Sequence, residues 1–503
     1  MWEFNIGFDI IIFINGKVDA KVGLTIKILL RSFIFMKKIS DNFCGYLKVG
    51  DDKCAYSVSN NIVTLLPAQN EETEIDEAFE RLRSRKTELP EYLLGEDYDG
   101  LIAIIRNDKF STRSLGFTPS IKFATPIIIK AEGNGEGFFR NLTEEWDRFH
   151  ATMFIGGNIN AVCNPQLAVE KSNYDGYLEN DGAREIKIRP WNDYTYSTEF
   201  EMDGEKIALT ISVAQTGEDV NAEHHGAYSL GELNSFIRLT FEKAKSFNDV
   251  EKYYSIIKDL IAILTLQNNV SFETDIRQKN SENELFRTGV CRIFDHYENY
   301  SVRKCQNVIS IYSISDYVPN LINAIMNNEA DSLLEILPED NGMIGKVTIT
   351  NIQDLCTALE VACKWGKRNR EKDNLIENLK KEIKKTIATF IESHDDMNAC
   401  NETTINSAFD YLDYTLKQKI LTLYNENRCI IDAIIAKRSL PQISEASVAA
   451  FVNLRNNKTH SGTVEWGDSA RIYTALLALG YACLFRYVDI PDKVIESVLI
   501  RIF

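Results

Sequence analysis

The stretch "TYSTEFEMDGEKIALTISV", residues 195–213, contains two runs in which apolar and polar residues alternate. Alternation with a period of two is typical of β-strands that have one buried face. Asp203 and Gly204 separate the two runs, and this pair favours the positive φ angles of a type I′ turn. The stretch therefore predicts a β-hairpin and indicates a strand-rich fold around it.

Similar short runs occupy the chain from about residue 40 to about residue 215. They are rich in Val, Ile, Thr and Tyr and are broken by Gly, Asn and Asp, which is the composition of strands and turns. We therefore expect a strand-rich α+β first half. The runs are "CGYLKV" (44–49), "CAYSVS" (54–59), "NIVTLL" (61–66), "GLIAII" (100–105) and "SIKFATPIII" (120–129).

After residue 228 the pattern is interpreted as helical. The stretch "SFNDVEKYYSIIKDLIAILTLQNN", residues 246–269, spaces its apolar residues as on one face of a helix, with Ser246 and Asn248 as candidate caps. The polar stretch "TDIRQKNSENE", residues 274–284, predicts a linker, because it has little to bury. We therefore expect a multi-domain chain, with a β-rich domain at 36–273 and an all-α helical bundle at 285–503.

Residues 1–35 are assigned to neither domain. They are strongly apolar and end at "MKKISDNF", which resembles a natural start of a bacterial protein. One hypothesis is that Met36 is the first residue of the native protein. The intact mass of natively expressed protein tests it, because a chain that begins at Met1 would dismiss the idea.

The composition excludes several classes of protein. No apolar run approaches the roughly 20 residues that span a bilayer. Acidic Glu3 and Asp9 lie where a secretory signal would be basic or apolar. We therefore expect a cytoplasmic protein with no membrane contact. The ten cysteines form no C-x-x-C pair, which indicates reduced thiols. The net charge is −17, with −12 in residues 1–280 and −5 in residues 281–503. Because the second half is less acidic, we expect a polyanion such as RNA to bind there.

Familiar motifs for nucleotide binding, for zinc proteases and for serine hydrolases are absent from the sequence. His224 and His225 are adjacent, but neighbouring strand residues point to opposite faces, so we interpret this pair as part of a loop. The stretch 364–385 holds nine basic residues and four acidic ones. Its usual meaning is a solvated helix face, and the alternative is a rim that contacts phosphates.

The stretch "NLRNNKTHSG", residues 453–462, carries the strongest candidate site. Ser444 can cap a helix whose apolar line runs through Val448, Phe451 and Val452, and the pair Ser461-Gly462 fits the end of that helix. At about 100° per residue, three polar residues then flank the face that should be buried. They are Arg455, Asn456 and His460.

Polar residues that continue an apolar stripe are costly in a core. They are therefore either paired inside the protein or exposed at an interface where they meet a polar partner. The sequence alone leaves both alternatives open, because an Arg followed by a His four to six positions later also occurs by chance.

"RNNKTH" resembles the R-N-x-x-x-H form of the motif of HEPN ribonuclease domains. The surroundings "SVAAFVNLRNNKTHSG" and "SARIYTALLALGYACLFRYV" are similar to the last two helices of a HEPN bundle. The segments "KISDNFCGYLKV", "YLLGEDYDGLIAIIR" and "SLGELNSFIRLTFEKAKSFNDVEKYYSIIKDLIAIL" resemble the N-terminal region of the ApeA family of phage-defence proteins. The resemblance spans most of residues 36–503, and residues 1–35 lie outside it.

The resemblance implies a metal-independent endoribonuclease with no cofactor, in which Arg455, Asn456 and His460 are catalytic. It also implies a homodimer in which two copies of the motif face each other, with tRNA or another cellular RNA as the substrate. Basic residues near the motif and on the predicted helix at 364–385 are candidates for RNA binding. They are Lys458, Lys380, Lys381, Lys384 and Lys385.

An enzyme of this kind would harm its own cell, so the resemblance also implies that the acidic first half restrains it until a trigger, such as a phage protein, appears. One alternative is a non-catalytic HEPN-like module that binds RNA or a protein partner. Another is a ligand- or carbohydrate-binding β domain on a helical scaffold, with Trp191 and Tyr194 as exposed aromatic residues, although core packing explains such residues more often.

Overall fold

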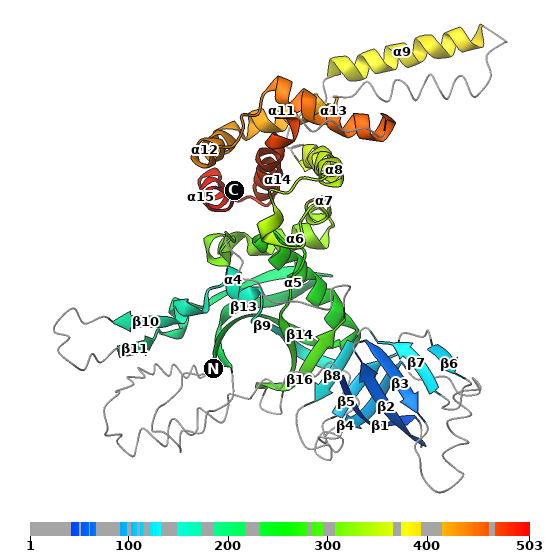
Figure 1. The fold of residues 1–503 in the computed structure, drawn as a ribbon, viewed down its shortest axis with the longest axis vertical. Helices are drawn as coiled ribbons and strands as arrows, with labels where there is room; N and C mark the ends of the chain where they lie inside the picture. The colour runs from blue at the N-terminus through cyan, green and yellow to red at the C-terminus, as the bar shows by residue number, and fades with distance from the viewer. Residues whose placement is uncertain are drawn as a thin grey trace. The chain divides into compact units, whose positions relative to one another are not determined.

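A strand-rich first half and a helical second half make up the chain, as the sequence predicts at that level (Figure 1). In the computed structural model the chain divides into two compact units. The strand unit comprises residues 1–265, 269–305 and 310–323, and the helical unit comprises residues 266–268, 306–309 and 324–503. The structure describes residues 42–49, 52–59, 61–66, 91–97, 102–107, 111–114, 120–125, 127–131, 148–172, 185–216, 232–279, 283–294, 307–365, 374–393, 415–461 and 468–503.

The strand unit is built on one sheet of 14 strands in the order β12-β13-β14-β9-β15-β16-β8-β5-β4-β1-β2-β3-β7-β6. Neighbouring strands in this sheet are antiparallel, and β10 and β11 form a separate pair. The strands are β1 (Asn42–Val49), β2 (Asp52–Ser59), β3 (Ile62–Leu66), β4 (Tyr92–Asp97), β5 (Ile102–Arg106), β6 (Ser111–Ser114), β7 (Ser120–Ala124), β8 (Ile127–Ala131), β9 (Arg148–Ile155), β10 (Val169–Ser172), β11 (Glu185–Ile188), β12 (Tyr196–Met202), β13 (Glu205–Thr216), β14 (Glu232–Ser246), β15 (Glu273–Lys279) and β16 (Leu285–Ile293).

The predicted hairpin is confirmed. Strands β12 and β13 pair from Tyr196↔Ile211 to Met202↔Glu205, which leaves only Asp203 and Gly204 as the turn. Both turn residues have positive φ angles, of 53° and 77°, as a type I′ turn requires. The turn therefore fixes the register of this edge of the sheet.

The early strands form their own core. Alternate residues of β1 to β5, β7 and β8 are buried together, among them Tyr56, Leu65 and Phe123. One side chain in two is buried along these strands because successive residues point to opposite faces. This alternation confirms the strands that were predicted from period-two patterning.

Helix α5 (Val250–Thr265) covers one face of β9 and β14. Ser246 begins the preceding 3-10 turn η3 (Phe247–Asp249) with a capping box, in which its hydroxyl accepts a hydrogen bond from the N–H of Asn248. The predicted cap and helix are confirmed, with Ile257, Leu260 and Ile261 fully buried. The helical interpretation of the residues just before 246 was wrong, because they form the long strand β14.

The predicted linker at 274–284 is also wrong. Most of it forms β15, which pairs with β9 and β16 inside the sheet, so its polar residues are held by strands from other parts of the chain. Strand β16 follows where the helical domain was expected to begin at residue 285. The continuous part of the helical unit instead begins at residue 324, within α6 (Val318–Met326).

The helical unit is organised around α14 (Tyr473–Tyr487), which is buried on almost every side. Its neighbours α8, α11, α12 and α15 surround it. The helices of this unit beyond α6 are α7 (Asp331–Leu334), α8 (Ile349–Trp365), α9 (Asn374–Glu392), α11 (Leu416–Glu426), α12 (Arg428–Arg438), α13 (Glu445–Ser461), α14 and α15 (Asp492–Ile502), with 3-10 turns η6 (Asn341–Met343) and η7 (Asp468–Ile472). None of the described helices combines the length and the hydropathy that crossing a bilayer requires.

Residues 1–35 lie outside the described residues, and so does the pair of His224 and His225. The remaining short elements are α4 (Ile159–Val162) and the 3-10 turns η1 (Pro165–Ala168), η2 (Trp191–Asp193), η4 (Ile311–Ser313) and η5 (Ser315–Tyr317).

Candidate active site on helix α13

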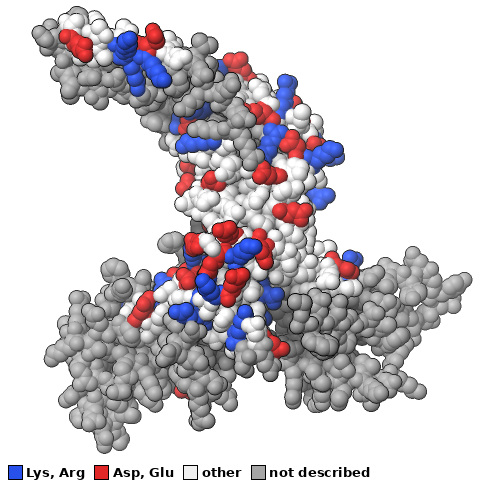
Figure 2. Space-filling model, turned by 180° about the vertical axis from the view of Figure 1, so that it is seen from behind, with Lys and Arg blue, Asp and Glu red and all other residues white. Residues whose placement is uncertain are grey.

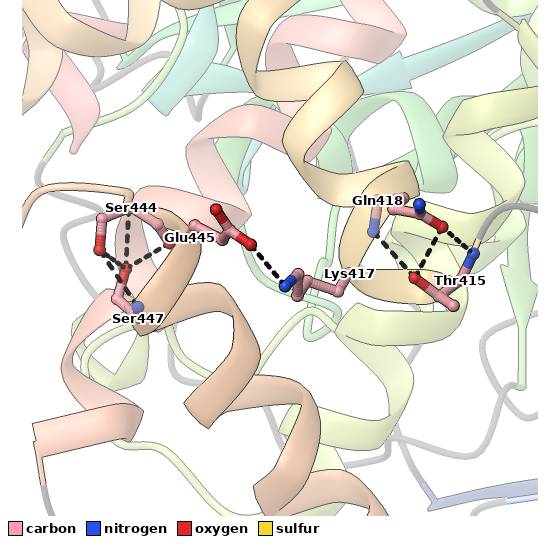
Figure 3. Close-up of polar contacts among 6 residues, drawn as sticks. All are labelled: Thr415, Lys417, Gln418, Ser444, Glu445 and Ser447. Carbon is pink, nitrogen blue, oxygen red and sulfur yellow. Dashed lines mark hydrogen bonds and ion pairs between the residues drawn. The ribbon is translucent and has the colours of Figure 1, made fainter.

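Helix α13 begins where the sequence predicts. The Ser444 hydroxyl accepts a hydrogen bond from the N–H of Ser447 (3.1 Å), and the Ser447 hydroxyl accepts one from the N–H of Ser444 (2.8 Å). This reciprocal pair satisfies a backbone donor that the first turn leaves without an intrahelical partner. The predicted cap at Ser444 is therefore confirmed (Figure 3).

An ion pair ties the same turn to a neighbouring helix. Lys417 of α11 lies 2.7 Å from the carboxylate of Glu445, and Thr415 caps α11 through a capping box with Gln418 (Figure 3). Hydrogen bonding to Lys417 holds the pKa of Glu445 below its usual range. The starts of α11 and α13 are thus fixed to each other.

The middle of α13 is anchored in the core of the helical unit. Val448 and Phe451 are completely buried and Leu454 is nearly so, while Val452 is only half-buried. The helix contacts α8, α11 and η7. This anchoring fixes the helix one turn before the candidate residues.

Arg455 and Asn456 follow directly and are half-buried. The Arg455 charge acts on the buried thiol of Cys356 in α8, where it opposes the burial that raises the pKa of this thiol to about 12. Helix α13 contacts α8, so this effect acts between neighbouring helices, and Arg455 keeps some exposure to solvent. Cys356 was not singled out from the sequence, since nothing local links residues almost a hundred positions apart.

The same helix continues through His460 and ends at Ser461, as predicted. On an α-helix, Asn456 and His460 are one turn apart on one side, whereas Arg455 is displaced from His460 by about 140° and about 7.5 Å along the axis. The side chains of His460 and Lys458 lie outside the described residues. The backbone thus carries the three candidate residues on one rigid element.

This set offers the groups that phosphodiester chemistry without a metal needs. A guanidinium can hold two phosphate oxygens, an imidazole can exchange protons near neutral pH, and an amide can orient either group. A histidine in the last turn of a helix is also favoured in its protonated form. Within the described ranges, no cluster of three or more His, Cys, Asp or Glu side chains could hold a metal ion.

The predicted basic helix exists as α9 (Figure 1). Lys381, Lys384 and Lys385 are exposed, and the side chain of Lys380 lies outside the described residues. Leu379 of the expected apolar stripe is 55% exposed rather than buried. In Figure 2 this helix lies at the upper left, where basic and acidic atoms are interspersed.

A small cavity of about 230 Å³ lies beside α8, α11 and α14, with Trp365, Asn427, Arg486 and Tyr487 in its wall. Trp365 stacks on Tyr487 with ring centroids 5.6 Å apart. The Arg486 guanidinium is already engaged by Asp492 and by the carbonyl of Glu426. The lining of the cavity is mainly apolar and aromatic but also includes Glu426, and it comes from α8, α11, α14 and Asn427 rather than from α13.

No protein-family model matches the chain, and comparison with curated proteins and with solved structures finds no match either.

Proposed function

We propose that the protein is a metal-independent endoribonuclease of the HEPN type, with Arg455, Asn456 and His460 as its catalytic residues. The observation that carries this proposal is their position on α13, immediately beyond a fully buried anchor at Phe451 and with Arg455 and Asn456 half-buried. A cation and an amide that remain partly accessible on a rigid helix suit a site that must meet a polyanion.

The reaction begins with attack of an RNA 2′-OH on the adjacent phosphorus. A base removes the 2′ proton, the bond from phosphorus to the 5′ oxygen breaks, and an acid protonates the departing 5′ oxygen. The products carry a 2′,3′-cyclic phosphate and a 5′-hydroxyl. DNA is not cleaved, because it lacks the nucleophile.

His460 supplies the proton transfers in this proposal, and Arg455 stabilises the negative charge that develops on the phosphorane. One motif contains one imidazole, so base and acid come from two copies of α13 in a homodimer. Monomers are expected to be inactive for this reason. The protein would act in antiviral defence, with tRNA or another cellular RNA as substrate and with the strand unit as the restraint that a phage-derived trigger relieves.

A second candidate is a HEPN-like binding module without catalysis. The observation that favours it is the contact of α13 with α8, across which the charge of half-buried Arg455 acts on Cys356, as would also occur if Arg455 only packed between these helices. In that case Arg455→Ala would lower stability, and RNA would be bound but never cut.

Cleavage of purified tRNA and total cellular RNA in EDTA distinguishes the candidates. Wild type, Arg455→Ala, His460→Ala and the control Lys437→Ala, at an exposed position of α12, are compared, and the product ends are analysed. We expect cyclic phosphate ends from wild type and Lys437→Ala only. If no preparation cuts, lysate from infected cells is added to relieve restraint.

Equal cleavage by all four proteins would overturn the proposal, because the activity would then lie elsewhere. RNA binding without cleavage, with the lysate present, would favour the binding module. Arg455→Lys adds a sharper test, since it keeps the charge and loses the planar fork, and we expect it to lose most activity.

A further inference from the structure

Three arginines and a buried aspartate share one face of the sheet in the strand unit. Arg238 of β14 and Asp275 of β15 both pair with Met153 of β9, so they stand in one row across three neighbouring strands. Arg277 follows Asp275 by two residues and pairs with Arg287 of β16. Because paired residues, and residues two apart on a strand, point to the same side, the four charged residues lie on one face.

The carboxylate of Asp275 interacts with two of these arginines. The guanidinium of Arg277 donates two hydrogen bonds to it, of 3.0 Å from Nη2 to Oδ2 and of 3.3 Å from Nε to Oδ1. The Nε of Arg287 lies 3.8 Å from Oδ2. The Asp275 side chain is only 1% exposed and that of Arg277 is 23% exposed, so the cluster is largely buried but open to solvent at Arg277.

Arg238 is the third cation of the cluster. Its Nε is buried and finds no hydrogen-bond partner among the residues that the structure describes, although Arg238 as a whole is half-buried. Burial lowers the pKa of its guanidinium, the charge of Arg277 lowers it further, and Asp275 opposes both. The group remains protonated, because an arginine pKa lies far above neutrality. Within this cluster, as far as the described residues go, three positive charges therefore meet the one negative charge of Asp275.

An aromatic surface adjoins the arginines on this face. Phe236 precedes Arg238 by two residues on β14 and packs with Met153 and Ile155. Trp191 stacks on Phe236, with ring centroids 6.2 Å apart and an interplanar angle of 29°, and is 47% exposed. Phe236 and Arg238 are about 7 Å apart along the strand. An exposed indole therefore lies close to the cationic cluster.

Helix α5 does not cover this face. The rings of its Tyr253 and Phe241 have centroids 4.7 Å apart, and Phe241 is three positions from Arg238 on β14 and so points to the opposite side of the sheet. Phe149, which also packs on Tyr253, lies beyond the register shift that separates it from Met153 on β9. The charged cluster and Trp191 thus lie on the side away from α5.

An excess of partly desolvated positive charge is costly unless an anion compensates it. Guanidinium forks match phosphate oxygens in geometry, and an indole stacks on any nucleobase. We propose that this face of the strand unit binds a nucleotide, with its phosphate on Arg238 and Arg277 and its base on Trp191. The site does not depend on the proposed ribonuclease activity, and its test measures binding alone.

Thermal shift and tryptophan fluorescence of the full chain test the site with AMP, ATP, adenosine and inorganic phosphate at constant ionic strength. We expect the nucleotides to raise the melting temperature of wild type, and adenosine and inorganic phosphate each to bind at least about tenfold more weakly. Arg238→Gln and Trp191→Leu should each weaken nucleotide binding about tenfold or more. Arg148→Gln, at an exposed position of β9, is the matched control and should bind as wild type does.

Arg238→Gln is chosen because Arg238 has no hydrogen bond to Asp275 among the contacts of that carboxylate, so the unliganded variant should keep the wild-type melting temperature within a few degrees. Absence of any shift with AMP or ATP at millimolar concentration would overturn the proposal. An equal shift in wild type and Arg238→Gln would also overturn it. Equal binding of phosphate and nucleotide, unaffected by Trp191→Leu, would overturn the assignment of a nucleotide.

Discussion

Lys417 of α11 and Glu445 of α13 form an ion pair with 2.7 Å between Nζ and Oε1, which links the first turns of two helices. Glu445 is the first residue of the helix that carries Arg455 and His460. An exposed pair adds little stability. Its consequence is geometric, because the pair and the Ser444 cap together define where the candidate catalytic helix begins.

The cap can be tested by Ser444→Ala. The substitution removes the acceptor for the N–H of Ser447, so we expect a loss of about 1 kcal/mol in the free energy of unfolding of the helical unit. Urea denaturation followed by circular dichroism measures it. Thr357→Ala in α8 is the control, because its exposed hydroxyl donates to the carbonyl of Gln353 and, among the described residues, caps no N–H. Equal losses in both variants would contradict the role of the cap.

The pair of Arg486 and Asp492 should make stability depend on pH. Arg486 donates two hydrogen bonds to Asp492, of 2.8 Å and 2.7 Å, and this bonding holds the pKa of Asp492 below its usual range. A carboxylate whose pKa is lowered by folding contributes stability above its unfolded pKa of about 4, and loses it as pH falls through the folded pKa. Asp492→Asn should therefore be less stable than wild type at pH 7 and nearly equal to it near pH 2.

Denaturation midpoints of wild type and Asp492→Asn at several pH values measure this effect. Arg486→Gln removes the same pair and should lose the same pH dependence. Glu392→Gln, at an exposed carboxylate of α9, serves as the control and should follow wild type. If the denaturation midpoints of wild type and Asp492→Asn differed by the same amount at every pH, Asp492 would act through packing rather than through its charge.

Gly157 should be intolerant of any side chain. Its φ angle is +53°, and a Cβ atom there would lie 2.0 Å from the carbonyl oxygen of Ser271. The next residue, Asn158, holds Ser271 through two hydrogen bonds of 2.9 Å, so that carbonyl cannot move away easily. We expect Gly157→Ala to destabilise the strand unit by more than about 3 kcal/mol.

Gly204→Ala provides the matched comparison for Gly157. Gly204 also has a positive φ angle, of +77°, but a Cβ atom there meets nothing within 4 Å. Its substitution should cost only backbone strain of about 1 kcal/mol. Thermal denaturation of both variants separates backbone strain from the steric contact with Ser271. Equal losses of stability in the two variants would mean that this contact relaxes freely.

The lysines of α9 can be tested for RNA contact by salt dependence. Lys380, Lys381, Lys384 and Lys385 fall within an arc of about 140° on this helix, so they can face one strand of RNA together. If each contacts a phosphate, changing one to Glu should reduce the slope of log K against log salt by about 0.7 or more. Lys206→Glu in β13, at an exposed lysine of the strand unit, is the control.

Binding of tRNA by His460→Ala, which the proposed mechanism predicts to be inactive, gives these slopes without cleavage when it is measured at several salt concentrations. An unchanged slope after Lys381→Glu, Lys384→Glu and Lys385→Glu would mean that α9 is only a solvated helix. Leu379 on the same helix is exposed whether or not the lysines contact RNA.

The sequence by itself determined the elements whose signals are local. The Asp203-Gly204 turn, the cap at Ser246 and the cap at Ser444 each act through backbone angles or hydrogen bonds within a few residues. Such signals need no distant partner, so the hairpin, α5 and α13 could be predicted with nearly their observed bounds.

Only the tertiary structure decided which polar segments are buried. Thr152 donates to the carbonyl oxygen of Asp275, 123 positions away, and Asp275 is buried because Arg277 and Arg287 compensate its charge. A polar segment predicted as a linker thereby became a central strand. The effect of the Arg455 charge on Cys356 has the same origin, because the contact of α13 with α8 brings together residues far apart in the sequence. Burial of a charge depends on partners that folding brings together, and a local pattern of residues cannot contain that information.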